Sequence, residues 1–200
     1  MNDLDLIAVS MNNMGIVAKH LGKYYTALDN FHIGLLIALI MGNERKIATG
    51  LHNVGIIHDV LGEIHYDNEE YDFAFKEFDE ALNLYEQCWT IEDKLKYEMG
   101  KSQVKNDIGM VYLHQDKHDE AISYFKESLA IKQKIGHYEG IYNNLYNIGL
   151  SYIDKDNYNQ ALPYLEDALD MAISIGNQKE IDKVNYELDK IKRDGEFRAG

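Results

Sequence analysis

The sequence predicts an all-α protein made of repeated helix hairpins. Four segments of the 200-residue chain each align on a shared glycine, at Gly15, Gly55, Gly109 and Gly149. Within each copy, apolar residues recur at three- and four-residue steps, which is the spacing of one face of an amphipathic helix. The chain has a single proline, so long stretches are open to helix formation.

Each copy is predicted to form two helices, A and B, joined by a tight turn. In three copies an alanine stands twelve residues after the glycine, at Ala27, Ala121 and Ala161. Small residues in the middle of helix A and on helix B let the two helices approach closely. The predicted N-caps of the last two B helices are Asp116 and either Asp156 or Asn157.

The second copy is longer than the others. Its helix B alanine, Ala74, lies nineteen residues after Gly55 rather than twelve, and seven further residues follow helix B. Because seven residues make about two helical turns, the sequence predicts lengthened helices and no disordered loop. The stretch from Glu63 to Glu80 carries eight acids and one lysine. These acids fit either a solvated helix start or a docking face for a basic partner.

The alternation of small and large residues resembles the tetratricopeptide repeat (TPR). It stands out at Gly109, Tyr112, Ala121 and Phe125, and again at Gly149, Tyr152, Ala161, Leu165 and Ala168. The 40-residue spacing of the first and last pairs of glycines is similar to the longer repeats of kinesin light chains, Pins-type scaffolds and Rap-type regulators. The resemblance implies a right-handed α-solenoid of four TPR hairpins plus a C-terminal capping helix.

The resemblance also sets the expected boundaries. Residues 1–194 are expected to form a single TPR domain, and residues 195–200 a disordered tail. The four repeats are expected at 3–42, 43–91, 92–136 and 137–176, with the capping helix at 178–194.

By the same resemblance, the A helices are expected to line a concave groove that binds an extended or helical peptide. Its candidate residues stand two before and one after each shared glycine: Asn13, Ile16, Asn53, Ile56, Asp107, Met110, Asn147 and Leu150. An asparagine offers a donor and an acceptor, which matches a peptide backbone. The alternative is that these polar groups satisfy helix ends or one another. Chaperone-binding TPRs use a basic clamp for a terminal carboxylate, and the matching positions here are not basic: Asn12, His52, Asn106 and Tyr146.

The run from Leu35 to Met41 is entirely apolar but too short to span a membrane. Three of its residues, Leu36, Leu39 and Ile40, align with several polar residues in the third and fourth copies. They are expected either to pack against the lengthened second copy or to form an interface patch for a homodimer or another partner.

Composition excludes several classes of function. The formal net charge of −14 argues against binding nucleic acid or an anionic membrane surface. The single cysteine, Cys88, excludes an internal disulfide and favours a cytoplasmic location. No catalytic constellation, cofactor or metal site is expected, because His114 and His118 fall across a predicted turn.

The sequence therefore predicts a non-enzymatic scaffold or adaptor that binds a protein or peptide. Two alternatives stay open. One is a sensory module of a larger signalling protein, such as a Rap-type protein, kinase, cyclase or transcription regulator. The other is a TPR chain that self-associates.

Overall fold

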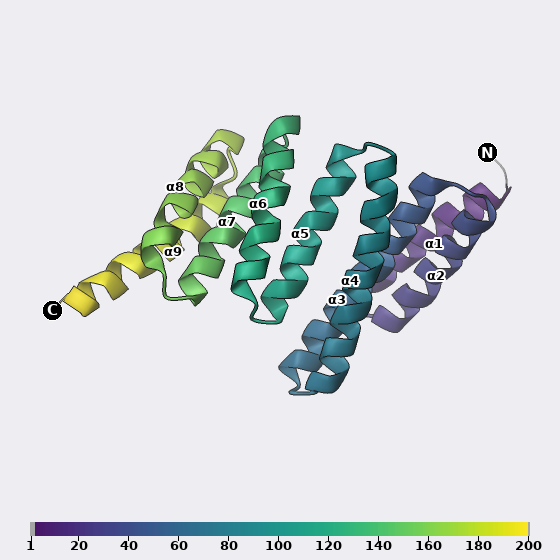
Figure 1. Ribbon diagram of the computed structural model, residues 1–200, viewed down its shortest axis with the longest axis horizontal. Helices are drawn as coiled ribbons and strands as arrows, with labels where there is room; N and C mark the ends of the chain where they lie inside the picture. Colours follow the sequence, from purple (N-terminus) through teal and green to yellow (C-terminus); the bar gives the residue numbers. More distant parts are fainter. Residues whose placement is uncertain (1–2, 200) are drawn as a thin grey trace. The chain divides into compact units, whose positions relative to one another are not determined.

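In a computed structural model, the structure describes the backbone of residues 3–199 and the side chains of residues 3–193. This part of the chain forms nine α-helices and no strand, which confirms the all-α fold class (Figure 1). The helices are α1 (Asp3–His20), α2 (Tyr24–Ile40), α3 (Glu44–Asp67), α4 (Tyr71–Lys94), α5 (Glu98–His114), α6 (His118–Ile135), α7 (Tyr138–Asp154), α8 (Tyr158–Ile175) and α9 (Gln178–Ala199).

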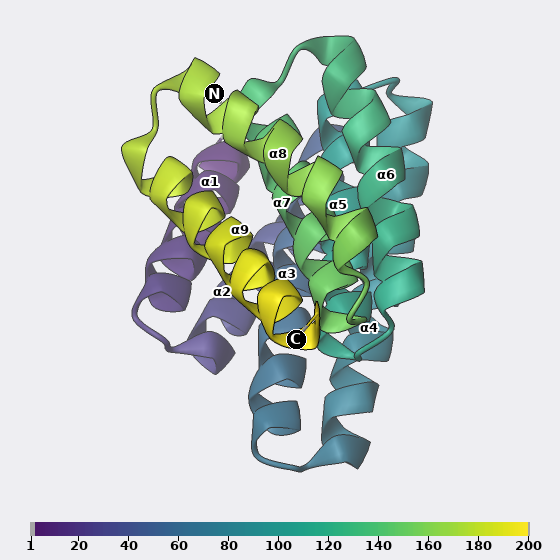
Figure 2. The ribbon, with the colours of Figure 1, turned by 90° about the vertical axis from the view of Figure 1, so that its left-hand side faces the viewer.

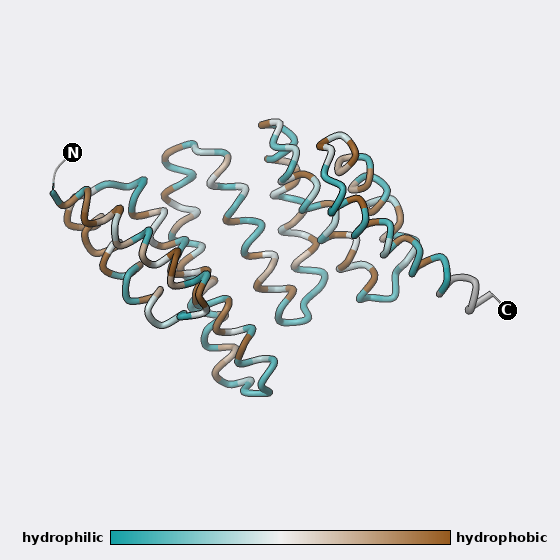
Figure 3. Tube along the Cα trace, turned by 180° about the vertical axis from the view of Figure 1, so that it is seen from behind, coloured by the Kyte–Doolittle hydropathy of each residue, from teal (hydrophilic) through white to brown (hydrophobic). Residues whose placement is uncertain are grey.

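The chain divides into two compact units between Val111 and Tyr112. In the first unit, α1 packs against α2 and α3 against α4, and α2 also packs on α3. In the second unit, α6 packs on α7, α7 pairs with α8, and α9 covers α8 (Figure 2). Apolar residues recur along each helix rather than gathering in one segment, as repeated amphipathic helices require (Figure 3).

Close packing within the first hairpin depends on the shared glycine. A Cβ added at Gly15 would lie 2.5 Å from Cε1 of Phe31, a contact that atoms cannot make without moving. Phe31 follows Gly15 by sixteen residues. The small residue in the middle of helix A therefore allows the close approach that the sequence predicts, here against a large ring on helix B.

The second hairpin is lengthened as predicted. Its helices α3 and α4 have 24 residues each, against 17 for α2, and their joined ends extend beyond α1 and α2 (Figure 1). Its internal register differs from the sequence alignment, however. The glycine that meets a ring sixteen residues later is Gly62, where a Cβ would lie 2.6 Å from Cδ1 of Phe78. Gly55 instead lies against Tyr85, because a Cβ added at Gly55 would lie 2.7 Å from Cε1 of Tyr85.

One of the predicted helix caps is wrong. Asp116 adopts a left-handed backbone, with φ of 57°, and Lys117 precedes α6 without a side-chain cap. Asn157, by contrast, caps α8, because its side chain accepts a hydrogen bond from the main-chain N–H of Gln160.

The last helix continues farther than the sequence indicates. The sequence places the end of the capping helix at residue 194 and a disordered tail from 195 to 200, whereas α9 runs to Ala199. Gly200 lies outside the described residues. No helix in the described part of the chain is both long and apolar enough to cross a membrane.

Candidate peptide-binding wall

In the first unit, α1, α3 and α5 carry six of the residues that the sequence assigns to a groove. Asn13 is exposed, and the other five are half-buried: Ile16, Asn53, Ile56, Asp107 and Met110. Half-buried positions of this kind combine a fixed side chain with access from outside. They therefore suit contact with a ligand.

Polar side chains connect these three helices in a row. The Asn53 amide donates from Nδ2 to Oδ1 of Asn12, at 2.5 Å, which joins α3 to α1. Nε2 of His52 lies 2.6 Å from Oδ2 of Asp107, which joins α3 to α5. Asn106 donates to the other oxygen of Asp107, at 3.1 Å. We call these five residues the polar row.

The polar row agrees in part with the alternative that these polar groups satisfy one another and do not bind a ligand. Asn53 and Asp107 do hydrogen-bond to neighbouring side chains, as that alternative expects. An asparagine amide has two N–H donors and one acceptor oxygen, so the bond to Asn12 engages only one group of Asn53. The row therefore holds the side chain of Asn53 in place without using its full hydrogen-bonding capacity.

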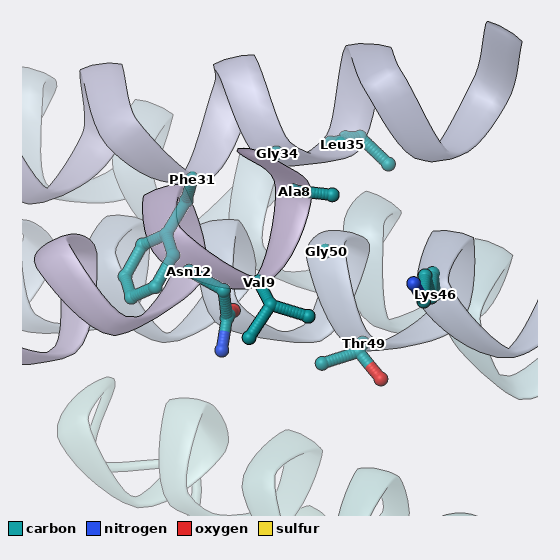
Figure 4. A pocket seen from close by; sticks show the side chains of 9 residues that line it. All are labelled: Ala8, Val9, Asn12, Phe31, Gly34, Leu35, Lys46, Thr49 and Gly50. Atoms are coloured by element: carbon teal, nitrogen blue, oxygen red, sulfur yellow. The ribbon is translucent and has the colours of Figure 1, made fainter. Parts of the chain in front are cut away.

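A first pocket of about 120 Å³ lies between α1, α2 and α3 (Figure 4). Its lining is mostly apolar: Ala8, Val9, Asn12, Phe31, Gly34, Leu35, Lys46, Thr49 and Gly50. Its volume approaches the roughly 150 Å³ of an apolar cavity that accommodates benzene in another protein. A branched aliphatic side chain is of suitable size for it.

A second pocket, of about 220 Å³, lies on the other side of α3, toward α4 and α5. Arg45 donates to Oε2 of Glu92 at 2.9 Å, and its guanidinium carbon stands 3.8 Å from the ring centre of Tyr97. Burial raises the pKa of Glu92, and the neighbouring Arg45 opposes that rise. Thr49 lines both pockets, so they adjoin along α3.

Sequence reasoning missed the second pocket. Arg45 and Glu92 are 47 residues apart and carry no shared motif. Cys88 also lines this pocket, and its thiol donates to the main-chain oxygen of Ala48 at 3.3 Å. Burial, with the nearby charges of Glu92 and Asp107, raises the pKa of the Cys88 thiol to about 12.

In the second unit, α7 carries the remaining groove candidates, Asn147 and Leu150, and both are half-buried. The main-chain oxygen of Asn147 accepts a hydrogen bond from Ser151. Deeper in this unit, the buried Asn144 accepts bonds from Lys132 and Ser128, at 2.6 and 3.2 Å. These bonds fasten α7 to α6.

The three apolar residues singled out on α2 are more than half exposed. Leu36, Leu39 and Ile40 are 57, 53 and 68% exposed. Neither the packing alternative nor the interface alternative is tested by this exposure, and both stay predictions. We call these three residues the α2 patch.

Within residues 3–193, no three side chains among histidine, cysteine, aspartate and glutamate gather as they would around a metal ion. His114 lies at the end of α5 and His118 at the start of α6, on either side of the turn that the sequence predicts.

Family comparisons agree with the helix-hairpin geometry. The tetratricopeptide repeat model matches residues 101–174, and a second repeat model, SHNi-TPR, matches residues 57–90. The chain contains tetratricopeptide repeats. No curated protein sequence matches this TPR chain.

Several solved structures share the TPR fold at low sequence identity. One is a putative kinesin light chain from Podosopora anserina, whose TPR-like repeats are nearly identical to one another. Its sequence is 13% identical to this chain, with a TM-score of 0.65 over 98% of this chain and 99% of that one. The Rap conjugation gene regulator of plasmid pLS20, in complex with the Phr* peptide, is 13% identical, with a TM-score of 0.73 over 92% of this chain and 47% of that one.

Aspartyl phosphate phosphatase F from Bacillus subtilis is 12% identical, with a TM-score of 0.72 over 92% of this chain and 45% of that one. The TPR chain thus spans about half the length of these two bacterial proteins, and 62% of RapI. At such identities the similarity is one of fold.

Proposed function

We propose that this TPR chain is a non-enzymatic scaffold that holds an extended or helical peptide against its A helices. The observation that carries the proposal is the arrangement of the first unit, in which two adjoining pockets flank the polar row of α1, α3 and α5. A peptide needs both backbone hydrogen bonds and side-chain pockets, and this surface supplies the two together. The Rap regulator solved with the Phr* peptide gives a precedent on the same fold.

The pockets indicate which side chains the ligand carries. The first pocket has a mostly apolar lining and suits an aliphatic residue. Beside the polar row, Ile16, Ile56 and Met110 add half-buried apolar surface. We therefore expect a peptide with hydrophobic side chains, with its main chain held by Asn53 in the first unit.

A random-peptide phage library selected on the purified chain tests the proposal. Selected peptides would be labelled, and their affinities measured by fluorescence anisotropy. Asn53→Ala is expected to weaken binding about two- to twelvefold, because one lost hydrogen bond is worth about 0.5–1.5 kcal/mol.

Asn83→Ala is the matched control, because Asn83 is an exposed asparagine on helix α4, away from the polar row. It is expected to leave the affinity unchanged. Selected peptides that bind the Asn53→Ala variant as tightly as the unchanged chain would refute the proposed groove.

A second proposal is that the chain is the sensory part of a larger signalling protein. It rests on the alignment of this chain with about half of each of two longer bacterial proteins, the phosphatase and the pLS20 regulator. Sequencing the native reading frame on both sides of the present chain tests it. A fused output domain is the expected result, and stop codons flanking the repeats would contradict it. For either proposal we expect a reducing, cytoplasmic location, because the only cysteine is a free, buried thiol.

A further inference from the structure

One side of α1 is an apolar helix-packing surface that the described part of the chain leaves open. Met14 and Val17 lie along one stripe of the helix, and Leu21, directly after its last residue, continues the stripe at a step of four residues; they are 53, 57 and 64% exposed. Ile7 begins the same stripe and is 43% exposed. We call these four residues the α1 stripe. Figure 3 shows apolar residues recurring along this N-terminal helix.

The corresponding stripe of α3 is buried. Forty residues after Met14, Val17 and Leu21 stand Val54, Ile57 and Leu61, which are 1, 0 and 4% exposed.

That stripe continues from Gly50, where an added Cβ would lie 3.0 Å from Cβ of Leu35 in α2. The stripe of α3 therefore faces the B helix of the preceding hairpin.

The second unit repeats this arrangement. On α7, Ile148 and Ser151 occupy the positions of Met14 and Val17, and both are fully buried. On the same side of α7, Asn144 donates to the main-chain oxygen of Phe125 in α6, at 3.2 Å. In both units, then, this side of an A helix is built to be covered by another helix.

The α2 patch is different in kind. Its counterparts in α6 are Ala130, Gln133 and Lys134, and those in α8 are Asp170, Ile173 and Ser174, all exposed. The α2 patch thus lies on a side that the other B helices also leave to solvent. The α1 stripe lies on a side that the other repeats bury, so it is the better candidate for an interface.

We propose that α1 of a second copy of this chain covers the α1 stripe, forming a two-fold homodimer. On α1 this interface adjoins the proposed peptide-binding wall at Asn13, which lies one helical turn from Val17. From Leu6 to Ala18, thirteen consecutive residues carry no charge, and residues 3–40 hold only three acids and two lysines. The whole chain carries −14, so two copies that meet at α1 bring together few of their like charges.

The ends of the chain favour a two-fold contact over a head-to-tail one. In a head-to-tail contact the α1 stripe of one copy would meet α9 of the next. Among the described side chains of α9, Tyr186 is the only large hydrophobic one that is exposed, and the rest of its exposed surface is mainly charged or amide. Such a contact would bury charges against apolar residues. An antiparallel α1 pair is self-complementary instead, with Met14 facing Met14 and Ile7 facing Leu21 across the two-fold axis.

Measuring the mass in solution tests the dimer. By multi-angle light scattering the chain is expected at twice its 23.1 kDa. Met14→Lys combined with Val17→Lys should return the mass to 23.1 kDa with an unchanged circular dichroism spectrum, because both side chains are exposed in the protomer. Leu36→Lys with Ile40→Lys is the matched control and should stay dimeric.

A monomeric wild-type chain would overturn the proposal. The α1 stripe would then be a surface for a helix other than α1 of a second copy. A dimer that survives the α1 changes, or one that the control dissociates, would overturn it as well.

Disulfide trapping tests the geometry of the pair. The one native thiol, Cys88, is buried, so Met14→Cys introduces the accessible thiol of each copy. The two introduced thiols meet at the two-fold axis, and mild oxidation should link most of the protein into a dimer on a non-reducing gel. Leu36→Cys should remain unlinked under the same conditions. The opposite pattern would place the interface at the α2 patch and refute the α1 pairing.

Discussion

At the scale of single residues, Cys88 is a buried cysteine that lines the second pocket. Its thiol is buried, and its pKa is raised to about 12, so only about one thiol in ten thousand is ionised at pH 8. Because the thiolate is the reactive form, we expect Ellman's reagent to label the native chain very slowly. Labelling during a urea titration should rise together with the loss of helical circular dichroism. Rapid labelling without denaturant would contradict the burial of Cys88.

Glu92 makes the stability of the chain depend on pH. Burial raises its pKa above the usual value of about 4.3, although Arg45 opposes that rise. The contribution of Glu92 to stability is therefore fully present below the usual pKa, and it is lost as the pH rises through the raised one. Glu92→Gln should flatten this part of the stability curve, because an uncharged side chain has no such proton linkage. Urea unfolding measured across the mildly acidic range checks this, and parallel curves for the two proteins would count against it.

At the scale of helices, the hairpins depend on glycines that admit an aromatic ring. A Cβ at Gly55 would lie 2.7 Å from Tyr85, so Gly55→Ala forces the ring or the helix to move. Such overpacking costs about 1–3 kcal/mol and outweighs the gain of up to about 1 kcal/mol in helix propensity. We expect Gly55→Ala to lower the free energy of unfolding in urea.

Gly34→Ala provides the matched comparison. Its added Cβ would lie no closer than 3.5 Å to any neighbouring atom, which is an ordinary contact. The propensity gain then acts alone, and the free energy of unfolding should stay the same or rise by up to about 1 kcal/mol. Equal destabilisation by the two substitutions would show that the glycines do not act through ring contacts.

The second hairpin shows what the sequence can and cannot predict at this scale. Repeated glycines and helical periodicity predict the hairpins and the lengthening of α3 and α4. The register within that hairpin also has a sequence signal, because Gly62 precedes Ala74 by twelve residues and Phe78 by sixteen. Two glycines seven residues apart satisfy the same helical pattern, however. Only the packed helices show that Gly62 meets Phe78 and that Gly55 meets Tyr85.

The candidate site is predictable to a smaller extent. Position relative to the shared glycine selects Asn53 and Asp107, both of which lie in the polar row. Their bonds to Asn12 and His52 depend on how closely neighbouring hairpins approach, and a single hairpin's pattern does not specify that distance. The pairing of Arg45 with Glu92 joins different hairpin elements in the same way. Such contacts between elements are the part of the site that the sequence leaves open.

At the scale of the whole molecule, the net charge of −14 governs stability and its dependence on salt. Like charges repel one another in the compact state, and salt screens that repulsion. We therefore expect the melting temperature to rise as sodium chloride is increased from about 10 mM to about 150 mM, where the screening length falls from about 30 to about 8 Å. Differential scanning calorimetry measures this directly.

The acidic stretch from Glu63 to Glu80 should account for a large part of that salt dependence. Asp79→Asn with Glu80→Gln removes two exposed acids from the interior of α4, away from the first turn, where an acid favours the helix. The variant should melt higher than the unchanged chain at low salt, and the difference should shrink as salt is added. A difference that stays constant across the salt series would show that the substitutions act through helix propensity rather than through charge repulsion.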